Sequence, residues 1–220
     1  MLGIVGKTGA GKTTIANLIA RIYDAKDGSV KIDGVDVKDL KLADLRKNIG
    51  LVSQDIYLFI GSIADNIRYA KPDATMSEVI AAAKAACAHD FIMKLPDAYQ
   101  TRVGAGGQRL SGGEKQRISI ARAICKQPEI FIFDDSFSAL DYKTDKILRS
   151  ELKKETNGAT TLIVAQRIGT IKNADKILVL HDGKIVGLGK HEDLLNNCDI
   201  YKEIALSQLS EEELNGKEVK

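Results

Sequence analysis

The sequence predicts an α/β fold in which a mostly parallel sheet is flanked by helices and interrupted by an inserted helical lobe. Short apolar runs alternate with segments of helix-forming composition along much of the chain. One of these runs, residues 130–133, is apolar throughout, which is typical of a buried parallel strand. In contrast, the stretch from about residue 63 to residue 124 is rich in helix formers and contains no convincing strand.

The individual elements follow from local patterns. We expect strands at the short apolar runs, residues 2–5, 49–53, 130–133, 160–165, 176–180 and 184–188. Helices are expected at residues 14–22, 42–47 and 143–154. Residues 28–37 alternate polar and apolar side chains around Asp33 and Gly34, a pair typical of a β-hairpin turn.

The 220 residues are enough for one domain with a substantial core. We expect a single domain (1–220) made of a core at 1–60 and 117–200, a helical subdomain at 61–116, and a C-terminal helix with a polar, fraying tail at 201–220. The sequence begins inside a predicted core strand, so further chain is expected upstream.

Composition narrows the class of partner. With a net charge of +2 the chain is too balanced to suggest a nucleic-acid surface, and no nucleic-acid partner is expected. No apolar run approaches the length that crosses a bilayer, and no signal peptide is recognisable, so a membrane role would depend on a partner or on an upstream region. The three scattered cysteines indicate free thiols in a reducing compartment.

A glycine-rich loop between the first predicted strand and the first predicted helix matches the pattern G-x-x-x-x-G-K-[ST]. The alternative is a turn that only connects the two elements, but such a turn would not need this pattern. Its residues are Gly6, Lys7, Thr8, Gly9, Ala10, Gly11, Lys12 and Thr13, with Thr14 continuing the helix. Glycines allow the backbone to wrap a phosphate chain, and the amides at the helix start attract the anion. Lys12 would reach the β- and γ-phosphates, and the Thr13 hydroxyl would bind Mg²⁺.

Two further motifs are ambiguous when taken alone. Asp134 ends an apolar strand, where a carboxylate either holds Mg²⁺ near the phosphates or serves as a turn residue. Ser111 and Glu114 form a capping box that opens a helix running to about residue 125. That helix start is either a simple cap or a second phosphate-binding site, and spacing does not separate the two.

The order of these motifs resembles an ABC-type ATPase over nearly the whole chain. It comprises the phosphate loop, Gln54, the segment at residues 110–117, Asp134 and the segment at residues 138–141. The sequence segments at residues 45–54, 61–67 and 189–195 are similar to those in the nucleotide-binding domains of ABC exporters in particular. The resemblance implies a P-loop NTPase fold with a RecA-like core. It also implies a small antiparallel β part, incomplete here because its first strands and the adenine-stacking aromatic lie upstream.

The resemblance implies that two such domains work as a dimer at the cytoplasmic face of the cell membrane. It also implies that each is attached to a transmembrane domain, which we expect upstream in the same polypeptide. ATP and Mg²⁺ would sit between the phosphate loop of one domain and the signature segment of the other. In this chain the signature residues are Leu110, Ser111, Gly112, Gly113 and Glu114. Thr13, Gln54 and Asp134 would bind the Mg²⁺ ion. Asp141 would lie at the interface between the two domains.

Two positions depart from the family pattern and change the functional expectation. Asp135 stands where the family has a water-activating Glu, and Gln166 stands where it has a His that contacts the γ-phosphate. Asp is shorter by about 1.5 Å, and Gln can donate a hydrogen bond but cannot carry charge. With Lys12, these are the candidate catalytic residues, and we expect a site that binds ATP and hydrolyses it slowly.

The matching hypothesis is a heterodimeric exporter whose non-identical partner supplies the missing Glu and His. Glu114, where Gln is common, is a further departure within the signature segment. One alternative is a homodimeric exporter ATPase with ordinary turnover. Another is a soluble ABC ATPase acting on DNA or ribosomes. Its SMC-type members insert a long coiled coil between the two nucleotide motifs, whereas here Asp134 follows Thr13 by only 121 positions. A small-molecule P-loop kinase would not need the signature segment.

Overall fold

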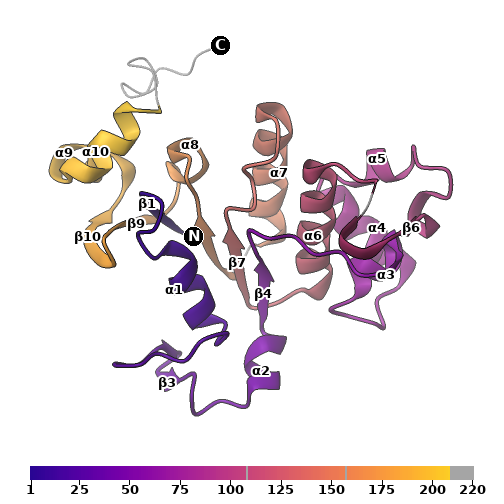
Figure 1. Ribbon diagram of the computed structural model, residues 1–220, viewed down its shortest axis with the longest axis horizontal. Coiled ribbons are helices and arrows are strands. Elements are labelled where there is room, and N and C mark those ends of the chain that lie inside the picture. Colours follow the sequence, from indigo (N-terminus) through magenta and orange to yellow (C-terminus); the bar gives the residue numbers. More distant parts are fainter. Residues whose placement is uncertain (108, 157, 209–220) are drawn as a thin grey trace. The chain divides into compact units, whose positions relative to one another are not determined.

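The computed structural model describes residues 1–107, 109–156 and 158–208, and it divides into two compact units (Figure 1). Unit 1 contains Met1–Leu45 and the chain from Thr161 onward, and unit 2 contains Arg46–Thr160. The α/β class with a mostly parallel sheet is confirmed. The division into a core and a helical subdomain at 61–116 stays a prediction. Of the C-terminal helix and tail expected at 201–220, residues 209–220 lie outside the described residues.

The strands of unit 1 follow the order β10-β9-β1-β8. Their bounds are β1 Leu2–Gly6, β8 Thr160–Val164, β9 Lys176–His181 and β10 Lys184–Gly189. β1 pairs in parallel with both β8 and β9, whereas β10 returns antiparallel to β9. Ile4 and Val5 are buried on this central strand, as its apolar sequence predicts. The parallel pairing brings the carboxyl ends of β1 and β8 to one edge of the sheet.

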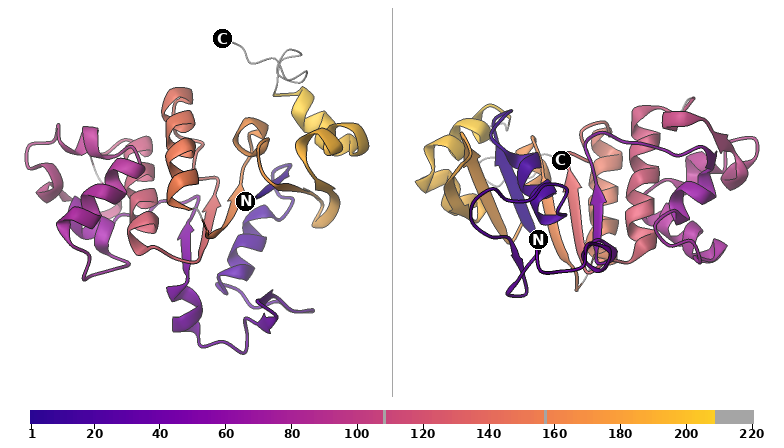
Figure 2. Two further views of the ribbon diagram at one scale, coloured as in Figure 1. Left: turned by 180° about the vertical axis from the view of Figure 1, so that it is seen from behind. Right: turned by 60° about the horizontal axis from the view of Figure 1, so that its bottom comes forward.

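The helices of unit 1 are α1 Lys12–Ile19, α8 Ile168–Ile171, α9 His191–Asn197 and α10 Asp199–Leu206. The last two lie beside β9 and β10 (Figure 2). The expected hairpin is present as β2 Lys31–Ile32 and β3 Val35–Asp36. Asp33 and Gly34 form its turn with φ of 50° and 83°, the left-handed values that a two-residue turn requires.

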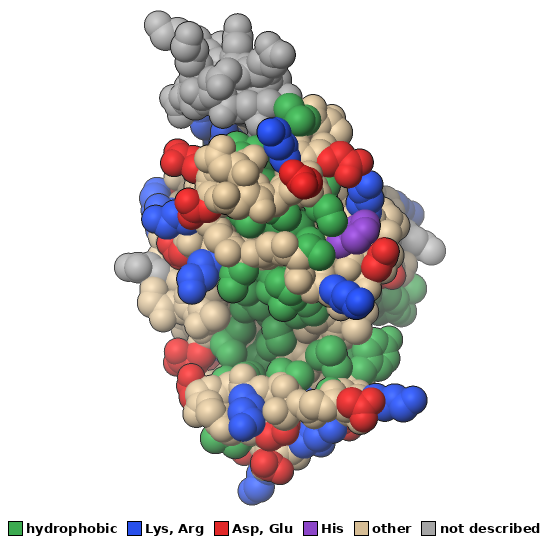
Figure 3. All heavy atoms as spheres, turned by 90° about the vertical axis from the view of Figure 1, so that its left-hand side faces the viewer, with side chains coloured by type: hydrophobic (Ala, Val, Ile, Leu, Met, Phe, Trp, Pro, Cys, Tyr) green, Lys and Arg blue, Asp and Glu red, His purple; other side chains and the backbone are tan. Residues whose placement is uncertain are grey.

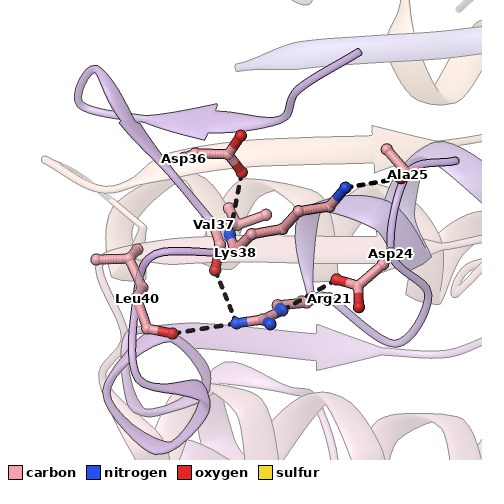
Figure 4. Close-up of polar contacts among 7 residues, drawn as sticks. All are labelled: Arg21, Asp24, Ala25, Asp36, Val37, Lys38 and Leu40. Carbon is pink, nitrogen blue, oxygen red and sulfur yellow. Dashed lines mark hydrogen bonds and ion pairs between the residues drawn. The ribbon is translucent and has the colours of Figure 1, made fainter. Parts of the chain in front are cut away.

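α1 ends three residues before the expected residue 22, because Arg21 adopts a left-handed conformation with φ of 49°. Its guanidinium donates to the carbonyls of Val37 (3.0 Å) and Leu40 (3.1 Å), beyond the hairpin (Figure 4). It also pairs with Asp24 at 3.1 Å. Lys38 reaches back to the Ala25 carbonyl at 2.8 Å, so these contacts tie the hairpin to the end of α1.

β10 is an exposed edge strand with apolar side chains. Ile185, Val186 and Leu188 on it are all exposed. Figure 3 shows apolar side chains gathered on the side of the molecule that carries this strand. An apolar edge strand of this kind is a surface that proteins ordinarily cover.

Unit 2 combines two parallel strands with a cluster of helices, which is visible around α6 in Figure 1. β4 Ile49–Val52 pairs in parallel with β7 Ile130–Asp134. The helices are α3 Ile63–Arg68, α4 Met76–Ala85, α5 His89–Ile92, α6 Gly112–Lys126 and α7 Tyr142–Glu155, with α2 Leu42–Lys47 at the boundary between the units. Single 3₁₀ turns form at η1 Ala98–Gln100 and η2 Ala105–Gly107. None of the helices in the described part of the chain is long and apolar enough to cross a membrane.

One expectation about this unit is wrong. The stretch from residue 63 to residue 124 contains a strand, β6 Arg102–Val103. This strand pairs antiparallel with β5 Gly61–Ser62, which lies immediately before residue 63. A ladder of two residues is too short to leave an alternating pattern in the sequence. It forms because the folding of the intervening helices brings the two segments together, a non-local effect that periodicity does not report.

Candidate functional site

The phosphate loop joins β1 to α1 in unit 1, where its backbone is shaped by glycine. Gly9 and Gly11 have φ of 82° and 98°, values that other residues rarely adopt. A Cβ on Gly6 would lie 2.3 Å from the Leu180 carbonyl oxygen on β9. The Gly183 amide donates to the Ala10 carbonyl at 3.2 Å, which anchors the loop to the turn between β9 and β10.

The side chains expected to bind phosphate lie at the start of α1. Lys12 Nζ contacts the carbonyls of Gly6 (2.8 Å) and Lys7 (3.0 Å), so the ammonium curls back over the loop. Thr13 and Thr14 occupy the first turn and are exposed, as are Lys7 and Thr8 in the loop. An anion over this loop would therefore meet an ammonium, hydroxyls and helix-start amides, which is the donor set that phosphate prefers.

Gln166 lies at the same sheet edge as the phosphate loop. It follows β8, and the Ala165 amide still donates to the Ile4 carbonyl on β1 at 3.0 Å. Its side chain is exposed, and its carbonyl accepts a hydrogen bond from the Gln208 side chain at 2.8 Å. Unit 1 therefore brings together two parts of the predicted site that are far apart in the sequence.

Gln54, Asp134 and Asp135 follow the carboxyl ends of β4 and β7 in unit 2. Val52 is in register with Phe133, so Gln54 and the two aspartates follow neighbouring strand ends. Asp134 is buried, Asp135 is half-buried and Gln54 is exposed. This arrangement places two carboxylates and an amide after neighbouring strand ends, and the roles expected for them stay predictions.

The turn after Asp134 is fixed by hydrogen bonds. Asp135 has φ of 47°, a left-handed conformation uncommon outside glycine. Its carbonyl accepts from Ser138 Oγ at 3.0 Å and from Gln116 Nε2 at 3.5 Å. Buried Ser136 donates to the Val52 carbonyl at 2.9 Å and joins the turn to the end of β4. The backbone that carries the Asp135 carboxylate is therefore held on several sides.

The capping box at the start of α6 is confirmed. Ser111 Oγ accepts from the Glu114 amide at 3.3 Å, and the Glu114 carboxylate accepts from the Ser111 amide at 2.8 Å. The Ser111 hydroxyl also donates to the same carboxylate at 2.9 Å. Glu114 thus places a negative charge at a helix start, where the helix dipole favours it.

A hollow of about 440 Å³ adjoins this helix start in unit 2. Its lining joins the signature segment to the beginning of α7 and consists of Ser111, Gly112, Gly113, Arg117, Ala139, Leu140, Asp141 and Thr144. Leu110, the remaining signature residue, is half-buried beside it in sequence. Asp141 caps α7 by accepting from the Thr144 amide at 3.0 Å, and hydrogen bonds from Thr144 lower the pKa of Asp141.

Sequence reasoning missed Arg117 and Thr144 in this hollow. Arg117 lies four residues after Gly113 on α6, and its guanidinium contacts the carbonyls of Gly113 (3.3 Å) and Cys87 (2.9 Å). A spacing of four on a helix places two residues on one face, so this signal was present in the sequence. Thr144 is the third residue after the Asp141 cap, a position that a capping argument identifies.

The predicted Mg²⁺ ligands are hard oxygen donors, which suit the ion. Thr13 lies in unit 1, whereas Gln54 and Asp134 lie in unit 2. Among the residues that the structure describes, no group of three or more His, Cys, Asp or Glu side chains could hold a metal ion. The three predicted donors come from both units, so the Mg²⁺ site stays a prediction.

Comparison with known proteins gives consistent results. A family model described as ABC transporter matches residues 1–138. The human protein ATP-binding cassette sub-family B member 6 is 47% identical over 212 residues, which cover 96% of this chain and 25% of that protein. The putative multidrug export ATP-binding/permease protein YgaD of Bacillus subtilis (strain 168) is 45% identical over 203 residues, covering 92% of this chain and 35% of the relative.

The fold also matches a solved structure. A bacterial Atm1-family ABC exporter with ATP bound superposes with a TM-score of 0.93 at 44% identity. The match covers 96% of this chain and 37% of the exporter chain. The chain thus spans between 25% and 37% of the length of these three proteins.

Proposed function

Because the chain belongs to the ABC transporter family, we propose that it is the ATP-binding domain that powers an exporter. Binding of ATP with Mg²⁺ would join two such domains head to tail, and hydrolysis would separate them. The phosphate loop of this chain would hold one nucleotide. The expected ligands of that nucleotide are Lys12, Thr13 and the loop amides. The assignment is supported by the exposure of Thr13 and by the Lys12 ammonium, which lies over the loop carbonyls of Gly6 and Lys7.

The hollow at the start of α6 is the proposed contact with the nucleotide of the partner domain. The Ser111 hydroxyl and the amides of Gly112 and Gly113 are the groups there that would meet a γ-phosphate. Asp141 shares the hollow and would lie at the dimer seam. Because the Ser111 hydroxyl already donates to Glu114, the phosphate would have to compete with that carboxylate.

We infer that the ATP site on this chain's own phosphate loop hydrolyses ATP slowly. The inference rests on the short side chain and the fixed backbone of Asp135. The Asp side chain reaches about 1.5 Å less far than that of Glu. The Asp135 carbonyl accepts hydrogen bonds from Ser138 and Gln116, which hold the backbone in place. A main-chain shift to recover the reach would break these contacts. Misplacement of a catalytic group by about 1 Å costs on the order of a hundredfold in rate. Gln166 adds to the loss, because it cannot carry charge or titrate.

A slow site on one chain implies a non-identical partner that carries the efficient one. In that heterodimer this chain would contribute its signature segment to the productive site and its phosphate loop to the slow site. The second candidate is a homodimer with ordinary turnover. It is favoured by the retained carboxylate at residue 135, which can still accept a proton.

The transmembrane partner is proposed to dock on an exposed aromatic surface that follows Gln54 in unit 2. Tyr57, Ile60 and Tyr69 are 55%, 72% and 56% exposed. Phe59 stacks on Tyr69 with ring centroids 4.0 Å apart and stiffens the surface. Aromatic side chains of this kind are enriched in the cores of interfaces. We place the transmembrane domain upstream in the same polypeptide, and this chain at the cytoplasmic face of the cell membrane.

The test uses the complete protein, purified alone and with its candidate partner, and measures ATP hydrolysis. Alone, the wild-type protein should hydrolyse slowly, and Asp135→Asn should change little. Asp135→Glu combined with Gln166→His should raise the rate by on the order of ten- to a hundredfold. Lys12→Ala is the control that removes phosphate binding and should abolish the gain. Brisk turnover of the protein alone, lost in Asp135→Asn, would show the homodimer to be correct.

A further inference from the structure

The turn that follows α10 makes two hydrogen bonds to the segment that carries Gln166. Gln208 Nε2 donates to the Gln166 carbonyl at 2.8 Å, and Gln208 Oε1 accepts from the Ile168 amide at 2.9 Å. One carboxamide thus binds a carbonyl and an amide on either side of Arg167, much as a neighbouring strand would. Both distances are those of well-formed hydrogen bonds.

Gln208 follows directly after a helix that is itself anchored, and its amide donates to the Ala205 carbonyl of that helix at 3.0 Å. Tyr201, Ile204 and Ala205 of α10 are buried. The Tyr201 hydroxyl meets His191 Nδ1 at 2.7 Å. The bonds from Gln208 therefore join the Gln166 segment to a fixed part of unit 1.

The same helix also contacts the phosphate loop. Glu203 Oε1 on α10 lies 3.0 Å from Lys7 Nζ. The pair is largely exposed and contributes little free energy of its own. Together, α10 and the turn after it therefore contact both segments, the phosphate loop and the Gln166 segment, that follow the carboxyl ends of β1 and β8.

We propose that Gln208 is a positioning residue for the nucleotide, which holds the main chain at Gln166 so that the Gln166 side chain can meet the γ-phosphate. This inference rests on the proposed function, which assigns Gln166 to that phosphate. The ligand class follows directly. A nucleoside triphosphate has the group that Gln166 would meet, and a diphosphate lacks it. Gln208 should therefore favour ATP over ADP without touching either.

The test is photolabelling of the complete protein in complex with its partner, using 8-azido-ATP and 8-azido-ADP without Mg²⁺. Labelling reports on each chain separately, so this chain's own site can be followed. Gln208→Ala should weaken ATP labelling of this chain about three- to tenfold, which corresponds to the loss of one or two hydrogen bonds. ADP labelling should stay within about twofold. Gln208→Glu keeps an acceptor for Ile168 but sets a carboxylate against the Gln166 carbonyl, so it should behave like Gln208→Ala.

Two comparisons make the test decisive. In a Gln166→Ala background, Gln208→Ala should have no further effect, because a positioning residue acts only through the group that it positions. Asn196→Ala is the matched control, because Asn196 is an exposed amide that bonds to a carbonyl of its own helix α9. It should change neither label.

Three results would overturn the proposal. If Gln208→Ala weakens ATP and ADP labelling equally, the residue is only structural. If Gln166→Ala discriminates between the nucleotides while Gln208→Ala does not, the positioning role is wrong and the function proposed for Gln166 stands. If Gln166→Ala leaves the ATP-to-ADP ratio unchanged, the assignment of Gln166 to the γ-phosphate fails, and the role of Gln208 fails with it.

Discussion

Arg122 on α6 holds together the aromatic surface proposed for docking, and its replacement by Met is the perturbation with the clearest expected magnitude. Its guanidinium donates to the Asn66 carbonyl (2.8 Å), the Asn66 side chain (2.9 Å) and the Tyr57 carbonyl (3.1 Å). It also lies over the rings of Phe59 and Tyr69, 5.2 and 5.8 Å from their centroids. Met keeps much of the aliphatic packing and removes all of these polar contacts.

The expected cost follows from what each contact contributes. Hydrogen bonds from a charged donor contribute about 1.5–3 kcal/mol each, and a cation–π contact contributes about 0.5–1 kcal/mol. Burial of the guanidinium offsets part of this gain and lowers the pKa of Arg122. The Asn66 side chain keeps the amide of Phe59 as a donor at 2.9 Å, which reduces the loss. We therefore expect Arg122→Met to lower the free energy of unfolding by about 3 kcal/mol.

Urea unfolding measures this change, and hydrogen exchange of residues 57–69 locates it. Exchange in that segment should rise in Arg122→Met and not in the matched control Lys153→Met, since Lys153 is an exposed residue of α7. The control should stay within about 0.5 kcal/mol of wild type. A loss below about 1 kcal/mol in Arg122→Met, or unchanged exchange at residues 57–69, would refute the view that Arg122 organises the surface.

Two further predictions test unit 1. Gly6→Ala should destabilise by on the order of 1–3 kcal/mol through overpacking and weaken ATP binding, because its Cβ would meet the Leu180 carbonyl oxygen at 2.3 Å. Urea unfolding checks this against Gly169→Ala, where the added Cβ has open space, and equal stability of the two variants would contradict it. Burial, aided by Lys172 and opposed by Glu192, lowers the pKa of His191 from 6.5. The folded protein then binds this proton less readily than the unfolded chain, so the free energy of unfolding should fall as pH drops below about 6.5. His191→Gln should reduce that slope, and an NMR titration midpoint for His191 above 6.5 would show the sign to be wrong.

Local patterns in the sequence identify most of the strands and the chemistry of the phosphate loop. The strand at β7 and the hairpin turn at Asp33 and Gly34 were predictable, because apolar runs and turn residues act over a few neighbours. The capping box of Ser111 and Glu114 was predictable for the same reason. The early end of α1 was not, because it depends on Arg21 reaching the carbonyls of Val37 and Leu40.

The sequence by itself determined the nucleotide chemistry of this chain and the two substitutions, Asp135 and Gln166, on which the proposed slow site rests. The tertiary structure alone decided which distant groups hold those residues. The carbonyl of Asp135 accepts from Gln116, 19 positions away, and the carbonyl of Gln166 accepts from Gln208, 42 positions away in the turn after α10. Side-chain chemistry is a property of single residues, so it can be read in order along the chain. Orientation depends on contacts between residues tens of positions apart, and only folding brings those contacts about.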